Sequence, residues 1–120
     1  MPSGYYISSE LAKDVLAFRD ERDWAQFHNP KDLAISLSLE AAELLEVFQW
    51  SAGDTGTDGR LDRIAEELAD VFNYAILMAD ACGLDAETII RDKLMRNGEK
   101  YPAAEFRGSR RKYNERKAEG

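Results

Sequence analysis

Apolar residues recur at intervals of three and four along most of the chain, which is the period of one face of an α-helix. The periodic segments are rich in helix formers and poor in β-branched residues, and none of the three prolines, Pro2, Pro30 and Pro102, interrupts them. A chain of 120 residues can bury the core of one domain. We therefore predict an all-α fold, a four-helix bundle forming a single domain over residues 1–120.

Capping residues and glycines indicate where the four helices begin and end. The expected starts are Ser8 or Ser9, Asp32, about Leu61 and Asp85. The second helix is expected to end near Trp50, and a flexible link rich in Gly, Asp and Thr follows over residues 51–59. Gly83 is well placed to end the third helix. Residues from about 101 to 120 form a polar C-terminal tail.

Charge and cysteine content restrict the classes of function. The formal net charge of -7 disfavours a surface for polymeric nucleic acid, although a small anion held through a metal or a few bases is compatible with it. Cys82 is the only cysteine, so an intramolecular disulfide and a thiolate zinc site are excluded. No apolar run is long enough to span a membrane, and the first ten residues lack the apolar core of a signal peptide. We predict a cytoplasmic protein without membrane contact.

Glutamates interrupt the apolar face of the predicted second helix. At about 100° per residue, Glu40 projects into the middle of the apolar stripe. Glu43 borders that stripe beside Trp50, whereas Glu46 lies farther round the helix. Glutamate is seldom buried without a compensating partner, so the inward position of Glu40 requires an explanation.

The predicted third helix repeats this arrangement within "EELAD". Glu67 projects into the apolar stripe of Ile64, Leu68, Val71, Ala75, Met78 and Cys82. Asp70 lies at its margin, and Glu66 lies on the opposite, solvated face. Each helix thus carries two acids at i and i+3 on one side of one turn.

Four carboxylates that meet inside a bundle must be protonated or must bind cations. Ligation by oxygen alone selects hard ions, with Mg²⁺ first and Mn²⁺ second. A di-iron bundle would use Glu-x-x-His pairs, but His28, the single histidine, lies on neither helix, and zinc lacks its usual ligands. The alternative is a charged helix face that binds nothing. Because both pairs have a member inside an apolar stripe, we favour the metal site.

The two acid pairs read Glu40-Ala-Ala-Glu43 and Glu67-Leu-Ala-Asp70, a pattern that resembles the MazG-like, all-α nucleoside triphosphate pyrophosphohydrolases. Further motifs are similar to the dCTP pyrophosphatase branch of that family: "ERDWAQFHNPKDL", "ELLEVFQW", "KLMRNGEKYP" and "SRRKY". The resemblance extends from about residue 18 to residue 113. Some members carry a histidine in the first helix near the base pocket, where this sequence is apolar around Val15, so base preference stays open.

The resemblance implies hydrolysis of a deoxynucleoside triphosphate, with dCTP or a modified dCTP as the best candidate, between the α- and β-phosphates. The products would be the monophosphate and pyrophosphate. The four acids would bind Mg²⁺ and be the catalytic residues, and one of them, for which we choose Glu43, would serve as general base. The resemblance also implies a homo-oligomer, a tetramer or a dimer, whose neighbouring subunits complete each site.

Basic residues near the end of the chain are candidates for phosphate binding. Lys93, Asn97 and Lys100 recur at intervals of four and three, so they share one side of the predicted fourth helix, and the resemblance assigns them phosphate or sugar contacts. A second cluster, of Arg110, Arg111, Lys112 and Tyr113, would close over the polyphosphate. The alternatives are an ordinary helix C-terminus and a solvated tail.

Aromatic residues are candidates for the walls of a base or sugar pocket. These are Trp24, Trp50 and Tyr74, with Phe27 and His28 nearby. Aromatic residues of a small bundle are as often plain core, and His28 next to a turn is equally compatible with a structural role.

Two other functions remain open from the sequence. The same scaffold could act on other nucleoside triphosphates or on a phosphoribosyl nucleotide. A helical interaction module without turnover is the other possibility, but its acidic face should point outward, whereas Glu40 and Glu67 project inward.

Overall fold

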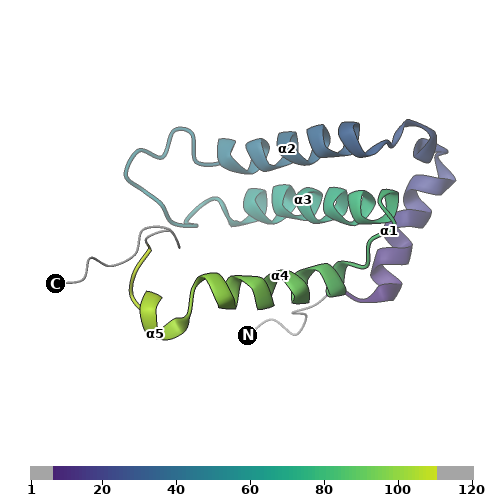
Figure 1. The fold of residues 1–120 in the computed structure, drawn as a ribbon. Helices are drawn as coiled ribbons and strands as arrows, with labels where there is room; N and C mark the ends of the chain where they lie inside the picture. The colour runs from purple at the N-terminus through teal and green to yellow at the C-terminus, as the bar shows by residue number, and fades with distance from the viewer. Residues whose placement is uncertain (1–6, 111–120) are drawn as a thin grey trace. The chain divides into compact units, whose positions relative to one another are not determined.

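The computed structural model describes residues 7–110, all of whose regular structure is helical. It divides into two compact units, one up to Leu84 and one from Asp85. The elements of the first unit are α1 (Ser9–Glu21), the 3₁₀ helix η1 (Trp24–Phe27), α2 (Pro30–Glu46) and α3 (Leu61–Ala81) (Figure 1). Those of the second unit are α4 (Ala86–Lys100) and α5 (Ala103–Phe106). The predicted all-α class is confirmed, and no described helix is long and apolar enough to cross a membrane.

The ends of α1 and α4 follow the capping signals of the sequence. The Ser8 side chain accepts a hydrogen bond from the backbone N–H of Leu11 at 3.1 Å, which satisfies one of the free donors at the start of α1. Asp85 caps α4 in the same way, through the N–H of Thr88 at 2.9 Å. Gly83 has a φ of +64°, the left-handed conformation that ends α3.

The start of α2 differs from the expectation, because Asn29 and not Asp32 is its N-cap. The Asn29 Oδ1 atom accepts from the backbone N–H of Asp32 at 2.9 Å, and its Nδ2 atom donates to the Asp32 carboxylate at 2.7 Å. Pro30 occupies the first turn, where its missing N–H costs nothing. The helix therefore begins earlier than predicted, and it ends at Glu46, before the turns that lead to Trp50.

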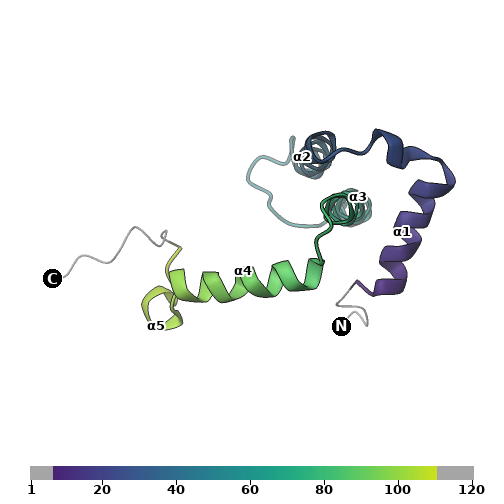
Figure 2. The same cartoon turned by 45° about the vertical axis from the view of Figure 1, so that its right-hand side comes forward.

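The core of the first unit lies between α2 and α3, which run antiparallel and side by side (Figures 1 and 2). Leu33 and Val47 are buried from the α2 side, and Leu77 from α3. The projected stripe of α3 is partly wrong, since Leu68, Ala75 and Cys82 are exposed while Leu77 is buried. The reason is that α3 packs against α1 as well as against α2. Its covered face is therefore wider than the predicted apolar stripe and includes Leu77.

The link between α2 and α3 is organised by Arg60. Its Nη1 atom donates to the Asp54 carboxylate and to the Gly56 carbonyl, both at 3.0 Å. Its guanidinium carbon also lies 5.6 Å from the centre of the Phe48 ring. These contacts join the end of one core helix to the start of the other, in a segment that the sequence indicated only as a loop.

Much of the apolar surface of the described chain is uncovered. Exposed large side chains of the first unit include Leu39, Leu45 and Trp50, the last with 89% of its surface accessible. On α4, Ile90 and Leu94 are likewise exposed. Soluble monomers rarely present so many apolar side chains, so surfaces of this kind commonly meet a partner.

Candidate metal centre and adjoining pocket

Three acids from the two core helices converge on one point of the α2–α3 interface. Glu40 comes from α2, and Glu67 and Asp70 come from one turn of α3. One carboxylate oxygen of each lies within 4.8 Å of those of the other two, and all three side chains are half-buried. The antiparallel pairing of α2 with α3 creates this cluster, because it brings the inward acids of both helices to the same level.

Glu43 lies at the edge of this cluster. It is exposed, yet its carboxyl group raises the pKa of both Glu40 and Glu67. The neighbouring acids Glu46 and Glu66 are exposed, and neither belongs to the group of converging oxygens. The structure thus separates inward from outward acids as the helical projection did.

The acids of the cluster raise one another's pKa. Burial, the proximity of the Glu43 carboxyl group and the charges of the neighbouring acids raise the pKa of Glu40 from 4.5 to about 7. The pKa of Glu67 is also raised, again first by burial and then by Glu43. The Oε2 atoms of Glu40 and Glu67 are buried without a hydrogen-bond partner among the described residues. Unpartnered carboxylate oxygens pointing into an acidic cluster fit a hard divalent cation, which would satisfy both atoms.

A cavity of about 380 Å³ adjoins the cluster and shares Asp70 with it. It lies between α1, η1 and α3, so the first unit contains all of it. Apolar and aromatic walls predominate, formed by Val15, Phe18, Trp24, Tyr74 and Leu77. Such walls suit a flat, partly apolar ligand placed next to the acids.

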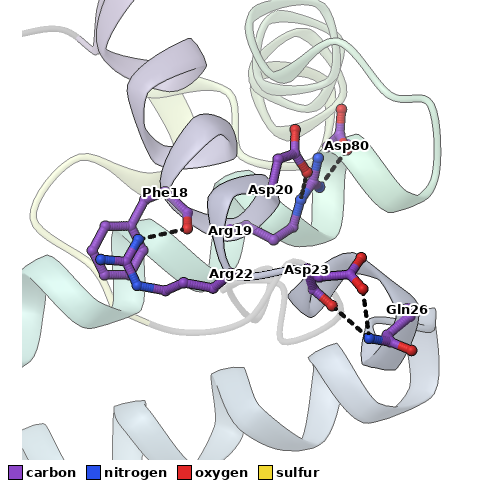
Figure 3. Close-up of polar contacts among 7 residues, drawn as sticks. All are labelled: Phe18, Arg19, Asp20, Arg22, Asp23, Gln26 and Asp80. Atoms are coloured by element: carbon purple, nitrogen blue, oxygen red, sulfur yellow. Dashed lines mark hydrogen bonds and ion pairs between the residues drawn. The ribbon is translucent and has the colours of Figure 1, made fainter.

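The segment before η1 fixes Trp24 in the cavity wall. The Phe18 and Trp24 rings meet edge to face, with centroids 5.8 Å apart. The Arg22 guanidinium carbon lies 3.5 Å from the Phe18 ring centroid, and Figure 3 shows these two side chains. Asp23 has a left-handed φ of 54°, and Gln26 donates to its carbonyl at 2.9 Å and to its carboxylate at 3.0 Å. The strained residue is thereby held where the chain turns toward the pocket.

Arg19 joins the opposite walls of the cavity. From α1, its Nε atom donates to Asp20 at 2.8 Å and its Nη1 atom donates to Asp80 of α3 at 2.7 Å (Figure 3). Its side chain is only 13% exposed. Sequence reasoning missed this pair because no local spacing connects residues that lie 61 positions apart.

Comparisons with known proteins show the family of the chain. The family model of MazG-like proteins matches residues 35–115, which include both acid pairs. The chain belongs to the MazG-like family.

Relatives of this MazG-like chain include two mammalian enzymes. It is 41% identical over 103 residues to dCTP pyrophosphatase 1 of Homo sapiens, and 38% identical over 104 residues to that of Mus musculus. Each match covers 82% of this chain and 61% of the relative, so the chain spans under two thirds of their length. A pyrophosphatase structure from Archaeoglobus fulgidus has a TM-score of 0.73 and 34% identity, and the match covers 85% of this chain and 98% of that one. The expected family and fold are confirmed.

The structure brings three of the four predicted base-site residues to one place. Trp24, His28 and Tyr74 all line the cavity, and the Nδ1 atom of His28 is buried without a described partner. Trp50 is not part of this lining and is almost fully exposed, and Phe27 is also outside it and exposed. Asp14, Arg19 and Asn73, which sequence reasoning missed, line the same cavity.

The predicted phosphate-site residues of the MazG-like chain belong to the second unit. Lys93, Asn97 and Lys100 lie on α4, with Asn97 half-buried and the two lysines exposed. The Asn97 carbonyl accepts a hydrogen bond from the N–H of Tyr101 at 2.8 Å, at the end of that helix. Arg111, Lys112 and Tyr113 lie outside the described residues, and Arg110 is the last residue described.

Proposed function

We propose that this chain is a metal-dependent nucleotide pyrophosphohydrolase that cleaves dCTP, or a modified dCTP, between the α- and β-phosphates. The products are the monophosphate and pyrophosphate. The observation that carries the proposal is the group of Glu40, Glu67 and Asp70, which opens into an aromatic cavity through their shared member, Asp70. Membership of the MazG-like family and the similarity to proteins named dCTP pyrophosphatase 1 support the choice of reaction.

The proposed cofactor is Mg²⁺, with Mn²⁺ as a substitute, held by Glu40, Glu43, Glu67 and Asp70. When bound, it would neutralise phosphate oxygens and lower the pKa of a water molecule. The ligand set is oxygen alone, which suits these two ions. Glu43 is the proposed general base, because it is exposed at the edge of the cluster and its carboxyl group can accept a proton from the attacking water.

The cavity is the proposed site of the base. Trp24 and Tyr74 provide flat walls, and His28 presents an unpartnered buried nitrogen. With the base in the cavity, the phosphates would lie beyond Asp70, over the acids. Lys93, Asn97 and Lys100, together with Arg111, Lys112 and Tyr113, are the proposed phosphate contacts, and they would counter the charge that the metal leaves uncompensated.

We further propose that the active form is a homo-oligomer, most simply a tetramer. The exposed apolar side chains of α2, α3 and α4 support this, because association would cover them. Trp50 is not part of the cavity of its own chain, so its proposed contact with a base would be made in the site of a neighbouring subunit.

Incubation of the purified protein with a panel of dNTPs and NTPs, with and without Mg²⁺, tests the proposed activity. The expected result is release of dCMP and pyrophosphate from dCTP only when the metal is present, followed by phosphorus NMR. Release of orthophosphate in place of pyrophosphate would contradict the cleavage position. A lack of turnover with every nucleotide would overturn the enzymatic function and favour an interaction module.

A further inference from the structure

The polar groups of the cavity differ in whether they already have partners. Arg19 is engaged by two carboxylates, those of Asp20 and Asp80. In contrast, the side chains of Asp14 and Asn73 make no hydrogen bond or ion pair with any other residue between 7 and 110. Both line the cavity, one from each side. Together with His28, these two side chains are uncommitted polar groups in a largely apolar pocket, and such groups can fix a ligand and select it.

Helix geometry places these two residues on opposite walls. On α1 the lining residues include Asp14 and Phe18, four positions apart, and on α3 they include Asp70, Asn73 and Leu77, at intervals of three and four. These spacings define one face of each helix. Asn73 therefore shares its face with the metal-cluster residue Asp70, while Asp14 faces it from α1.

We propose that Asp14 and Asn73 read the hydrogen-bonding edge of the base and select bases that carry an exocyclic amino group beside a ring nitrogen acceptor. This inference rests on the proposed function, since it assigns the cavity to the base of the nucleotide. Cytosine has the required edge, with an amino group at N4 and an acceptor at N3. Adenine presents the same amino group and acceptor, at N6 and N1. Asp14 and Asn73 would therefore distinguish amino from keto bases, but not a pyrimidine from a purine.

The chemistry of the two side chains explains the selection. An ionised carboxylate can only accept hydrogen bonds, so Asp14 pairs with an amino group. Asn73 offers an amide N–H₂ to the ring nitrogen and an amide oxygen to a second donor. Uracil and thymine present a carbonyl at position 4, which would face the Asp14 carboxylate and leave two acceptors without a donor. Asp14 and Asn73 are exposed at the cavity wall, so it is the bound base that would cover them, and a base that leaves the covered polar groups unpaired is rejected.

The charge of the cavity also argues against a phosphate as its occupant. Asp14 and Asp70 contribute negative charges, and the guanidinium of Arg19 is neutralised by its own two aspartates. An anion placed there would be repelled, whereas an amino group would be attracted. The triphosphate end is thus directed away from the cavity and toward the metal cluster.

Two isosteric substitutions test the inference without changing the shape of the pocket. Asp14→Asn adds a donor that can pair with a carbonyl at position 4, and Asn73→Asp replaces the donor to the ring nitrogen by an acceptor. We expect each to lower kcat/KM for dCTP about tenfold or more, the value of one good base contact. Asp14→Asn should also raise kcat/KM for dUTP, so that the dCTP-to-dUTP ratio falls by more than tenfold. Glu10→Gln, an exposed acid of α1 outside the cavity lining, is the matched control and should leave the ratio unchanged.

Binding of the monophosphates separates this inference from the proposed reaction. Isothermal titration calorimetry of the native chain should report tighter binding of dCMP than of dUMP, with the preference lost in Asp14→Asn. If the native chain turns over no nucleotide but discriminates dCMP from dUMP through Asp14, the inference holds and the proposed reaction fails. If dCTP is hydrolysed and both variants keep the native ratio, the reaction holds and the inference is overturned. Failure of both monophosphates to bind would also overturn it.

Discussion

Glu66 and Glu67 are adjacent in the sequence but lie in different environments. Glu66 is exposed, whereas Glu67 is half-buried and its Oε2 atom has no described partner. On the proposed mechanism only Glu67 holds the metal, and Glu40 does so from the facing helix. A glutamate-to-glutamine change should therefore lower activity strongly at Glu67 and hardly at all at Glu66.

We predict that Glu40→Gln and Glu67→Gln each lower kcat for dCTP by about a hundredfold or more. Loss of a residue that only supports a metal ligand already costs about 10–100-fold, and these residues are the proposed ligands themselves. Glu66→Gln should keep kcat within about twofold, because it removes a solvated charge. Steady-state kinetics with Mg²⁺ measure the effect, and circular dichroism checks the fold. Equal losses in Glu66→Gln and Glu67→Gln would show that the acids are wrongly assigned to their faces.

The raised pKa of Glu40 predicts how the stability of the metal-free protein depends on pH. The pKa rises from 4.5 to about 7 on folding, so the folded chain binds this proton more tightly than the unfolded chain. The stabilisation is therefore complete below the unfolded pKa and is lost as the pH rises from about 4.5 to about 7. In EDTA, we expect the Tm of Glu40→Gln to fall less than that of the native protein over this window. Mg²⁺ should restore the native Tm near neutral pH, because it binds only the folded state. If Tm depended on pH in the same way in Glu40→Gln and the native protein in EDTA, the raised pKa of Glu40 would be contradicted.

At the residue scale, the sequence predicted the groups whose position depends on one helix. The spacing of Glu40, Glu67 and Glu66 was enough to separate inward from outward acids. Asp14 and Asn73 could not be identified in this way, because each is an ordinary polar residue on its own helix. They become notable only when α1 and α3 meet around a cavity.

At the scale of elements, α1 is the least firmly attached wall of the cavity. None of its residues is fully buried, and Arg19 supplies the ion pair that connects it to α3. Only the Arg19 side of this pair is shielded, since 13% of the Arg19 side chain is exposed but 42% of the Asp80 side chain. The position of the proposed base pocket thus depends in part on this ion pair, beside the packing of α1 against α3.

We predict that Arg19→Met raises KM for dCTP on the order of fivefold and changes kcat little, since coupling within such a pair amounts to about 1 kcal/mol or more. Arg19 is here a positioning residue, because it acts through α1 and not on the reacting atoms. The reversed pair, Arg19→Asp with Asp80→Arg, should recover most of the native KM. Arg91→Met removes an exposed ion pair within α4 and serves as the control. A loss of kcat with KM unchanged would contradict the positioning role, as would a failure of the reversed pair to improve on Arg19→Asp alone.

Capping residues predicted the starts of α1 and α4 but not the start of α2. Ser8 and Asp85 cap α1 and α4 as expected. At α2 the sequence predicted Asp32, but Asn29 is the N-cap, because proline is accommodated in the first turn of a helix and Pro30 can therefore follow the cap directly. The short helices η1 and α5 have four residues each, which is too short for a periodic pattern to reveal.

At the scale of the whole molecule, the sequence predicted the all-α class because every long segment has a helical period. It could not predict how much of the apolar surface would remain uncovered. An amphipathic pattern shows that a helix has an apolar face, but not whether that face meets its own chain or another one. Leu39 and Leu45 lie on α2, and both are exposed.

We predict that the native protein is a tetramer at micromolar concentration, measured by sedimentation equilibrium, and that Leu39→Glu shifts it to smaller species. Burial of a leucine contributes about 1.5–3 kcal/mol, and placing a charge in an apolar interface costs more. Ser38→Glu is the control, since it adds the same charge at the adjacent exposed position. If Trp50 completes the site of a neighbouring subunit, Leu39→Glu should also raise KM for dCTP, and this increase should diminish as protein concentration restores the assembly. A native protein that is monomeric at all concentrations and fully active would exclude both the tetramer and the contribution of Trp50 to a neighbouring site.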